Sequence, residues 1–406
     1  MCTQPKLVLG IETSCDDTGV AIVDSEGRIH FEALSSQFDT HLPFGGVVPK
    51  LAKRDHEINL PRLLKEAELS VGSFDRLSAV AATAGPGLAL CLRVGYRAGR
   101  ELAFHRQLPF VAVNHLEAHV LVPRLEQDKN ELKFPYLALL VSGGHCMILL
   151  TRGVDDHVRL GTTHDDSLGE AYDKVARMLE LESKGGGGGP ALELIAKEGD
   201  EDSIPFPVPL RHRKDCMFSF SGLKTAVYLA CNKLGDGSGG GGLTRSEKAN
   251  VAASFQKAAR VHLQQRLKYA LDWCDQGVAN GTLLNAPTCV VVTGGVASNQ
   301  YLRDHLTNVV KERNDSCDKE DIVENEKDRT GSVEMMHMDV RFPPLRLCTD
   351  NGVMVAWAGQ ERLALGMSDD STPPIDGLES FKTRWPLGGE EIKSKKGRVM
   401  IDVPIL

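Results

Sequence analysis

The sequence predicts an α/β fold whose sheets are covered by helices. Short apolar runs of strand length alternate with longer stretches in which apolar residues recur at helical spacing. Strand-like runs include LSAVAAT at 77–83, PFVAVN at 109–114 and TCVVVTGG at 288–295, and helical stretches include 93–105 and 250–274. A chain of 406 residues, 42% hydrophobic and 25% charged, is long enough to bury two cores, so two domains are expected.

The chain is expected to begin with a β-hairpin and to repeat that pattern later. The apolar runs 7–12 and 20–24 flank the polar segment SCDDTG, which is rich in turn-forming residues. YLALLVSGGHCMILLTRG at 136–153 again places small and polar residues between two apolar runs. An internal repeat of this kind indicates two similar lobes. Three segments rich in glycine or charge are expected to be loop insertions, near 185–189, 235–242 and 311–336.

Composition excludes several classes of protein. No run approaches the roughly 18 uninterrupted apolar residues of a membrane span, so no transmembrane helix and no membrane partner are expected. Ten cysteines without a Cys-x-x-Cys pair favour a reducing compartment over a disulfide framework or a cysteine-rich zinc module. A strand-like run begins at Lys6, so this sequence has no room for a secretory signal or an Arg-rich transit peptide, and we expect that either there is none or it is missing here.

Any nucleic-acid partner must be met by a local basic patch, because the formal net charge of the chain is -8. Such short clusters are more often solvated surface than binding sites. The candidates are Arg93, Arg97 and Arg100 at helical spacing, the run from Arg211 to Lys214, and the cluster of Lys50, Lys53 and Arg54.

Two histidines in the segment NHLEAH form a candidate metal site. His115 and His119 lie at i and i+4, so on a helix they share a face and can bind one ion together. The alternative is a helix surface that carries two histidines by chance. In a zinc-protease motif the glutamate follows the first histidine directly, whereas Glu117 lies at i+2 on another face of the helix. A metalloprotease is therefore disfavoured.

Glycine-rich turns and acidic residues recur after the strand-like runs. The turns are Gly85-Pro86-Gly87, Ser142-Gly143-Gly144 and Thr293-Gly294-Gly295. Together they indicate nucleotide binding, because backbone N–H groups at such turns approach phosphate oxygens closely, although each alone is more often a plain turn. The acidic residues are Glu12, Asp16, Asp17, Asp165, Asp166, Asp173 and Asp350. Most of them are expected to cap helices, and the others are candidates to bind ribose or a metal ion.

Seven motifs occur in the order seen in one enzyme family. They are ETSCDDT, HLEAH, LLVSGGHC, GEAYDKVARML, FSFSGLKT, TGGVASN and LCTDNG, and they extend over nearly the whole chain. On these residues the sequence is similar to the universal tRNA threonylcarbamoyl transferases, once called sialoglycoprotease-like proteins. Leu140 in LVSGGH matches the bacterial and organellar branch, and LCTDNGVMVAW with the WPLG segment resembles the animal mitochondrial member most.

The resemblance implies an actin-like ATPase (ASKHA) architecture, with two RNase H-like lobes and an active-site cleft between them. The implied domains are an N-terminal lobe at 1–133, a C-terminal lobe at 134–349 and a segment at 350–406 that packs back on the N-terminal lobe. The implied reaction passes the threonylcarbamoyl group of threonylcarbamoyl-AMP to the exocyclic amine of the adenosine at position 37 of tRNAs that read ANN codons. AMP is released.

Site residues follow from matching motif to motif. His115, His119 and Asp350 would hold one divalent metal ion per subunit, zinc or iron, which orients the threonylcarbamoyl group and polarises its carbonyl. The implied substrate-binding residues are Leu140, Val141, Ser142, Gly143, Gly144, Asp173, Gly189 and Asn299. Gly189 is chosen because it precedes Pro190, although ESKGGGGGP departs from the YPGGP of the family. The expected catalytic general base is Asp16 or Glu12 in the first hairpin, with His145 as the alternative.

The implied partners are tRNA and a separate synthase that supplies threonylcarbamoyl-AMP. Likeness to the mitochondrial branch implies a homodimer in the mitochondrial matrix, with the cytoplasm as the alternative. A small-molecule kinase of the same fold is a second hypothesis, because it shares the glycine turns but has no need of His115 and His119. A non-enzymatic scaffold that uses the cleft as a nucleotide switch is a third, since it would tolerate loss of the metal site.

Overall fold

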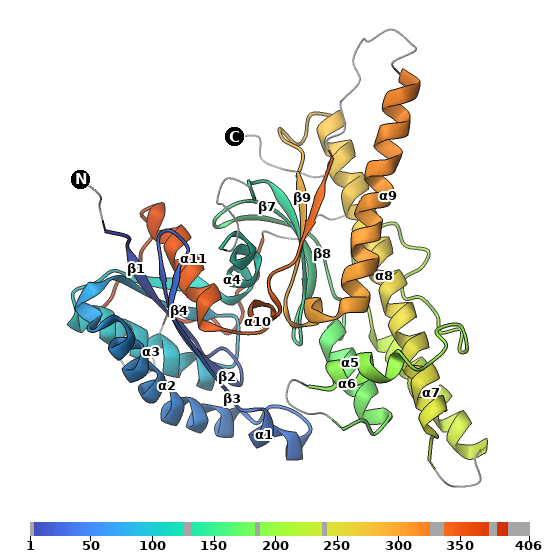
Figure 1. Ribbon diagram of the computed structural model, residues 1–406, viewed down its shortest axis with the longest axis horizontal. Helices are drawn as coiled ribbons and strands as arrows, with labels where there is room; N and C mark the ends of the chain where they lie inside the picture. Colours follow the sequence, from blue (N-terminus) through green and yellow to red (C-terminus); the bar gives the residue numbers. More distant parts are fainter. Residues whose placement is uncertain are drawn as a thin grey trace. The chain divides into compact units, whose positions relative to one another are not determined.

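The structure of the protein, a computed structural model, describes six stretches of the chain. They are 4–125, 132–182, 187–237, 242–324, 337–372 and 380–388. The chain divides into two units (Figure 1). Unit 1 comprises Met1–Leu132 with Pro343–Leu387, and unit 2 comprises Lys133–Phe342 with Gly388–Leu406. Each unit contains one five-stranded sheet with helices packed on it, so the predicted α/β class is confirmed.

The sheet of unit 1 has the strand order β3-β2-β1-β4-β5. The first three strands form an antiparallel meander, whereas β4 pairs in parallel with β1, and β5 in parallel with β4. The strands are β1 (Leu7–Glu12), β2 (Asp17–Asp24), β3 (Ile29–Ser36), β4 (Leu77–Gly85) and β5 (Phe110–Asn114). The helices are α1 (Phe38–His41), η1 (Leu42–Phe44), α2 (Pro49–Val71), η2 (Phe74–Arg76), α3 (Ala89–His105), α4 (His115–Leu121), η3 (Val122–Arg124), α10 (Leu345–Cys348) and α11 (Gly352–Ala364).

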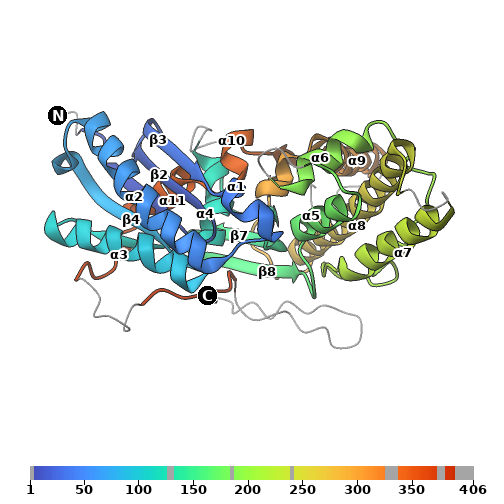
Figure 2. The same ribbon diagram turned by 90° about the horizontal axis from the view of Figure 1, so that it is seen from below.

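Strand β1 is buried on both faces of the sheet, which explains why it reads as one continuous apolar run. Leu9 and Ile11 join the core formed with α2 and α3, two helices that lie side by side (Figure 2). Gly10 faces α11 instead, and a Cβ at Gly10 would lie only 2.2 Å from the backbone nitrogen of Ala356. Because only glycine permits this approach, α11 packs directly on the sheet. The packing fixes the chain just before α11, where Asp350 lies.

The sheet of unit 2 has the same topology, with the strand order β10-β9-β6-β7-β8. Strands β6, β7 and β8 are antiparallel neighbours, and β9 and β10 extend the sheet in parallel from β6. The strands are β6 (Tyr136–Val141), β7 (Cys146–Gly153), β8 (Asp156–Thr162), β9 (Cys289–Thr293) and β10 (Asp339–Arg341). The helices are α5 (Leu168–Met178), α6 (Gly188–Ala196), α7 (Ser221–Gly237), α8 (Arg245–Ala279), η4 (Gly295–Ser298) and α9 (Gln300–Glu324).

The two units therefore repeat one another strand for strand. The hairpin β1–β2 corresponds to the hairpin β6–β7, and β4 corresponds to β9. This confirms the internal repeat and the two similar lobes that the sequence predicts. No helix in the described stretches is both long enough and apolar enough to span a membrane.

Helix α9 continues into the charged stretch that the sequence assigns to a loop at 311–336. The helix ends at Glu324, and residues 325–336 lie outside the described stretches. Arg313 on α9 pairs with Asp275 on α8 at 2.6 Å between Nη2 and Oδ1, so this charged helix packs through an ion pair. Lysine and glutamate are also good helix formers, which explains why charge alone does not indicate a loop.

The two glycine-rich segments also differ in part from the expected loops. At 185–189, α6 begins at Gly188, and residues 183–186 lie outside the described stretches. At 235–242, α7 continues to Gly237, and residues 238–241 lie outside the described stretches. Glycine at a helix end costs little, because the terminal residues make few of the hydrogen bonds of the helix.

Candidate active site

The two histidines of unit 1 lie on one face of α4, as their spacing predicts. Asn114 at the end of β5 caps this helix, and its side-chain oxygen accepts hydrogen bonds from the backbone N–H groups of Leu116 at 2.9 Å and Glu117 at 3.3 Å. The cap starts α4 at His115, so that His119 follows one turn later. Both histidines are buried, at 7% and 1% exposure.

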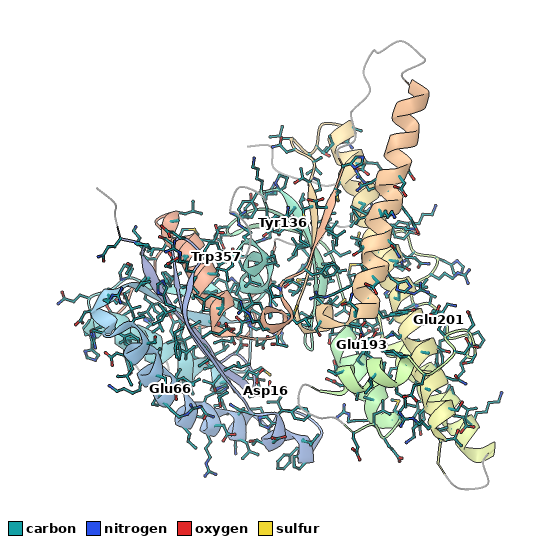
Figure 3. The ribbon with its side chains drawn as sticks, in the orientation of Figure 1. Asp16, Glu66, Tyr136, Glu193, Glu201 and Trp357 are labelled. Atoms are coloured by element: carbon teal, nitrogen blue, oxygen red, sulfur yellow. The ribbon has the colours of Figure 1, made fainter. Side chains whose placement is uncertain are left out.

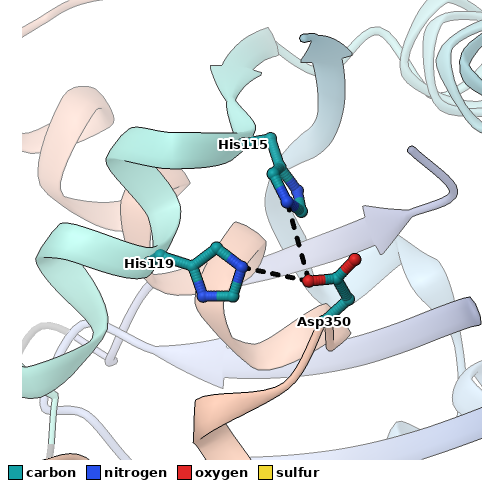
Figure 4. Close-up of side chains that lie close together, drawn as sticks. All are labelled: His115, His119 and Asp350. Carbon is teal, nitrogen blue, oxygen red and sulfur yellow. Dashed lines mark hydrogen bonds and ion pairs between the residues drawn. The ribbon is translucent and has the colours of Figure 1, made fainter. Parts of the chain in front are cut away.

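Asp350 joins the two histidines within unit 1 (Figure 4). Its Oδ1 atom lies 3.0 Å from Nε2 of His119 and 3.6 Å from Nε2 of His115, and one donor atom from each residue lies within 4.8 Å of the others. An ion bound at about 2.1 Å needs donor atoms roughly 3.0–3.4 Å apart, and the two nitrogen–oxygen separations are near this range. Two imidazoles and a carboxylate suit zinc or iron. The residues therefore fit a divalent metal ion.

Glu12, at the end of β1, lies behind His115 and is fully buried. Its Oε2 atom lies 3.3 Å from Nδ1 of His115 and accepts a hydrogen bond from Thr83 at 2.5 Å. Its Oε1 atom accepts a hydrogen bond from the backbone N–H of Ser14 at 2.5 Å. This placement does not suit the general base expected at Glu12, because the carboxylate has no exposed edge and its oxygens already accept protein hydrogen bonds.

The other residue expected as a base, Asp16, lies in the turn between β1 and β2 and is half-buried (Figure 3). Beside it, burial together with the charges of Asp16 and Asp350 raises the pKa of Asp17 to about 7. Sequence reasoning noted Asp17 only as one of several acids in the turn, because its pKa depends on burial and on a residue far along the chain.

Electrostatics around His115 favour a cation. Burial acts to lower the pKa of His115, but the negative charges of Asp350 and Glu12 outweigh it and raise that pKa to about 9. Burial likewise acts to raise the pKa of Glu12, and the interaction with His115 outweighs it and leaves the pKa lowered. A proton and a metal ion compete for the same imidazole nitrogen, so a site that stabilises one positive charge can also bind the other.

Glu117 forms an ion pair with an arginine of α11. Its Oε2 atom lies 2.6 Å from Nη1 of Arg362 on α11, and the glutamate is fully buried. The ion pair joins α4 to α11, the two helices that position the metal-ligand candidates. Glu117 therefore cannot act as the base of a zinc protease, which agrees with the argument from its spacing.

In unit 2, only some of the predicted substrate-binding residues at 140–144 are exposed. Leu140 and Val141 are buried in β6, so their side chains contribute to the core. Ser142 is half-buried, and Gly143 and Gly144 are exposed. A Cβ at either glycine would meet nothing within 4 Å, so open space adjoins the backbone there.

The structure places Asp173 beside the start of α6. Its Oδ1 atom accepts a hydrogen bond from the backbone N–H of Gly188 at 2.7 Å. Gly187 has φ of 82°, and a Cβ at Gly187 would lie 2.9 Å from the same oxygen, which explains the glycine there. Gly189 is half-buried, and a Cβ at that position would meet nothing within 4 Å. Burial raises the pKa of Asp173, while the N–H groups of Gly188 and Gly189 act against that rise.

Asn299 is buried at the start of α9 and caps that helix. Its Oδ1 atom accepts from the backbone N–H of Leu302 at 2.9 Å, and its Nδ2 atom donates to Gln256 on α8 at 3.1 Å. Gln256 also lines an adjacent pocket of about 340 Å³. The polar residues of the pocket wall are Lys197, Glu201, Gln256, Gln300, Tyr301 and Asp304. Figure 3 labels Glu201 on this wall and Glu193 on α6, whose Oε1 atom accepts from the backbone N–H of Gln300 at 2.9 Å.

Asp165 is a capping residue, as expected for most acids in turns. Its carboxylate accepts hydrogen bonds from the hydroxyl of Ser219 at 2.6 Å, the hydroxyl of Ser221 at 2.7 Å and the backbone N–H of Phe220 at 2.8 Å. These contacts hold the FSFSGLKT motif at the start of α7. The neighbouring Asp166 lies at 3.2 Å from Lys174 and 2.5 Å from Lys224, so these acids are structural in the described residues.

Of the basic clusters, the run 211–214 is the most exposed. Arg213 pairs with Asp215 at 2.6 Å, whereas neither Arg211 nor Lys214 has an ion pair within the described stretches. By contrast, Arg100 is buried and lies 3.6 Å from Asp370. The cluster predicted on α3 is therefore not one continuous cationic stripe.

Comparisons with known proteins find one matching family and several similar relatives. The model of the family described as TsaD, tRNA N6-adenosine threonylcarbamoyltransferase, matches residues 28–357. A probable mitochondrial tRNA N6-adenosine threonylcarbamoyltransferase of Arabidopsis thaliana is 42% identical over 96% of this chain and 76% of its own length. A tRNA N6-adenosine threonylcarbamoyltransferase of Paramagnetospirillum magneticum is 42% identical over 96% of this chain and 99% of its own.

A solved structure, the HypF protein of T. kodakarensis, shares the fold. It superposes with a TM-score of 0.55 at 15% identity, covering 90% of this chain and 49% of its own. At this identity the likeness concerns the fold alone.

Proposed function

The chain belongs to the tRNA N6-adenosine threonylcarbamoyltransferase family, and we propose that His115, His119 and Asp350 hold the metal ion used in its reaction. It is a transferase that modifies adenosine in tRNA. The observation that carries the proposal is the convergence of two Nε2 atoms and one carboxylate oxygen from distant parts of the sequence. Zinc or iron, one ion per subunit, fits this donor set.

The finer reaction is transfer of threonylcarbamoyl from threonylcarbamoyl-AMP to the exocyclic amine of the adenosine at position 37 of tRNAs that read ANN codons. When bound, the metal ion supplies Lewis-acid polarisation of the carbonyl that the amine attacks. The amine of adenine is a poor nucleophile, so holding both reactants in place supplies much of the rate enhancement. Asp16 is the proposed proton acceptor, because it is half-buried in the hairpin turn while Glu12 is enclosed.

The proposed binding site of the acyl-adenylate lies in unit 2. The exposed backbone at Gly143 and Gly144 and the half-buried Gly189 leave room for close approach of a ligand. Asp173 uses one carboxylate oxygen to cap α6, which leaves the other for a ribose hydroxyl. Asn299 contributes by fixing Gln256 in the wall of the adjacent pocket, where the base of the adenylate is proposed to bind.

The loop 211–214 is the proposed contact for the tRNA backbone. Arg266 on α8, fully buried, donates to the backbone oxygen of Asp215 at 2.8 Å and to that of Leu210 at 3.3 Å, so it holds both ends of the loop. Arg211 and Lys214 are thereby presented to solvent on a fixed backbone. Fixed cations suit phosphate contacts because less conformational entropy is lost on binding.

The remaining proposals concern partners and location. A separate synthase supplies the threonylcarbamoyl-AMP, and the protein acts as a homodimer. The name of the Arabidopsis relative supports a mitochondrial location for this chain, with the cytoplasm as the alternative.

The test is reconstitution of the reaction. The purified protein is incubated with threonine, bicarbonate, ATP, an acyl-adenylate synthase and unmodified tRNA, and digested RNA is analysed for threonylcarbamoyladenosine by mass spectrometry. Appearance of the nucleoside without other subunits supports both the reaction and the self-sufficient organellar branch. Appearance only after accessory subunits are added supports the reaction and rejects self-sufficiency, and absence in both settings rejects the reaction.

A further inference from the structure

The carboxylate of Glu12 lies between three elements of unit 1 but faces no solvent. It extends from the end of β1, contacts Thr83 on β4, and reaches His115 at the start of α4. Its exposure is 0%, and burying an unpaired carboxylate is costly, so its hydrogen bonds must offset that cost. The cost indicates that the position has a use beyond filling the core.

The three groups in hydrogen-bonding contact with Glu12 are all able to donate to it. The Thr83 hydroxyl and the Ser14 backbone N–H each donate at 2.5 Å, and Nδ1 of His115 lies at 3.3 Å. An ionised carboxylate accepts from all three and needs no donor of its own. Nε2 of His115 faces Asp350, so Nδ1 is the nitrogen that carries the proton when Nε2 binds an ion. Nδ1 lies 3.3 Å from Glu12 and 3.2 Å from the hydroxyl oxygen of Ser14, and of these two groups only the carboxylate is unable to donate to it, so Glu12 favours the protonated form of this nitrogen.

We propose that Glu12 is a positioning residue that holds His115 in the ring orientation and tautomer needed to bind the metal ion. The inference rests on the proposed metal site and goes beyond it, because it assigns a role to a residue that touches neither metal nor substrate. Thr83 acts in the same chain of contacts by fixing Oε2 of Glu12 from the opposite side. His119 has no such link to Glu12 in the described contacts, so the effect falls on one of the two histidines.

A purely structural role for Glu12 is the alternative. Unit 1 offers a matched control in Asp24 at the end of β2, a carboxylate at 1% exposure whose Oδ2 atom lies 2.8 Å from Nε2 of His30. Asp24 also accepts hydrogen bonds from the backbone N–H groups of Glu26 and Arg28. It has the same chemistry as Glu12, in the same sheet, without a link to His115, His119 or Asp350.

The experiment measures metal binding by the full chain without any tRNA or nucleotide. Metal-free wild type, Glu12→Gln, Thr83→Val and Asp24→Asn are titrated with Co²⁺ against a chromophoric chelator, and the visible absorption of bound Co²⁺ is recorded. Thermal unfolding of each metal-free protein measures the structural cost separately. Partners that orient a metal-bound histidine typically contribute about 10–100-fold in affinity.

We expect Glu12→Gln to weaken Co²⁺ binding about 10–100-fold and to change its absorption, Thr83→Val to have a smaller effect in the same direction, and Asp24→Asn to match wild type. If Glu12→Gln binds Co²⁺ as wild type does, or if Asp24→Asn loses as much affinity, the positioning role is rejected while the metal site stands. If the wild type itself binds no Co²⁺, both the metal site and this role are rejected. Since no transfer is measured, none of these results depends on the tRNA reaction.

Discussion

Two buried histidines, one in each unit, have pKa values displaced in opposite directions. In unit 1, Asp350 and Glu12 outweigh burial and raise the pKa of His115 to about 9. In unit 2, burial and the charge of Arg266 lower the pKa of His262 to about 3. Residue type and burial are the same, so the neighbouring charges decide whether a histidine attracts a cation or stays neutral.

The rings around His262 show the structural use of such a residue. Phe218 and Phe220 meet it edge-on, with ring centroids at 5.6 Å and 5.4 Å, and Ser219 donates its backbone N–H to Nε2 at 3.3 Å. A neutral imidazole can accept this bond, whereas a doubly protonated ring cannot. His262 therefore helps to hold the FSFSGLKT motif, and it has no carboxylate like Glu12 bonded to its ring in the described contacts.

The equivalent hairpins of the two units differ in the same way. The turn from β1 to β2 contains Asp16 and is flanked by Glu12 and Asp17, while the turn after β6 contains Ser142 and two glycines. One strand topology thus carries a charged turn in unit 1 and an open backbone turn in unit 2. The chemistry of each unit is set by the residues at its strand ends rather than by its topology.

The largest expected effect is on unit 1. His119→Ala removes a ligand and should lower tRNA modification by more than about a hundredfold, since losing a mere orienting partner already costs 10–100-fold. Threonylcarbamoyladenosine in digested tRNA and metal content are measured, with His105→Ala as the control because His105 is exposed on α3. Normal tRNA modification by the His119→Ala variant would show that the reaction does not need the histidine pair. The contrast between the histidines of the two units would then have no functional meaning.

The pH dependence of unit 2 follows from His262. Its folded pKa of about 3 lies below the ordinary value of 6.5, so as pH falls below 6.5 the unfolded chain binds a proton that the folded unit does not. Stability is present above pH 6.5 and is lost as pH falls, by about 2 kcal/mol between pH 7 and pH 5. Hydrogen exchange of peptides from α8 measures the change.

His262→Gln should flatten that pH dependence, because glutamine does not titrate and can still accept from Ser219. His212→Gln, at an exposed histidine of the same unit, should leave it unchanged. An equal pH dependence in His262→Gln and wild type would mean that other groups cause the acid loss.

The open backbone of unit 2 predicts a substrate effect without a folding effect. Gly143→Val places its side chain where a Cβ meets nothing within 4 Å, so unfolding should be unchanged. The same side chain would obstruct the acyl-adenylate and raise its Kd about tenfold, or 1.4 kcal/mol.

Gly169→Ala is the control for Gly143→Val. The Cβ of an alanine at 169 would lie 2.7 Å from the backbone oxygen of Ser142, so this variant should affect folding. It should lower the thermal stability of unit 2. Calorimetry and AMP binding are measured on both variants. Equal AMP affinity of Gly143→Val and wild type would show that the ligand does not approach this turn.

The smallest expected effect concerns tRNA binding. Arg211→Glu should lower affinity several-fold and reduce the slope of log K against log salt by about 1, since each lost phosphate contact releases about one counterion fewer. Arg213→Glu should act more weakly because Arg213 is paired with Asp215. Arg97→Glu should act more weakly still because the side chain of Arg97 is only 34% exposed, against 48% for Arg213. Unchanged slopes in all three would place the tRNA elsewhere.

The sequence by itself determined the features that follow from local periodicity. Alternating apolar runs gave the strands and helices of both units, the repeated hairpin indicated two similar lobes, and i,i+4 spacing placed His115 and His119 on one helix face. The motifs also identified the family. These inferences succeeded because a strand or helix pattern is written into neighbouring residues.

Only the tertiary structure decided what lies around those elements. It enclosed Glu12 behind His115, buried Leu140 and Val141 in β6, and placed Asp350 beside α4 through the packing of α11 on Gly10. A sequence pattern records which face a residue occupies but not which distant segment covers it. Burial and neighbouring charge decide whether a carboxylate acts as a base or positions another residue, and both depend on which distant segments pack around it.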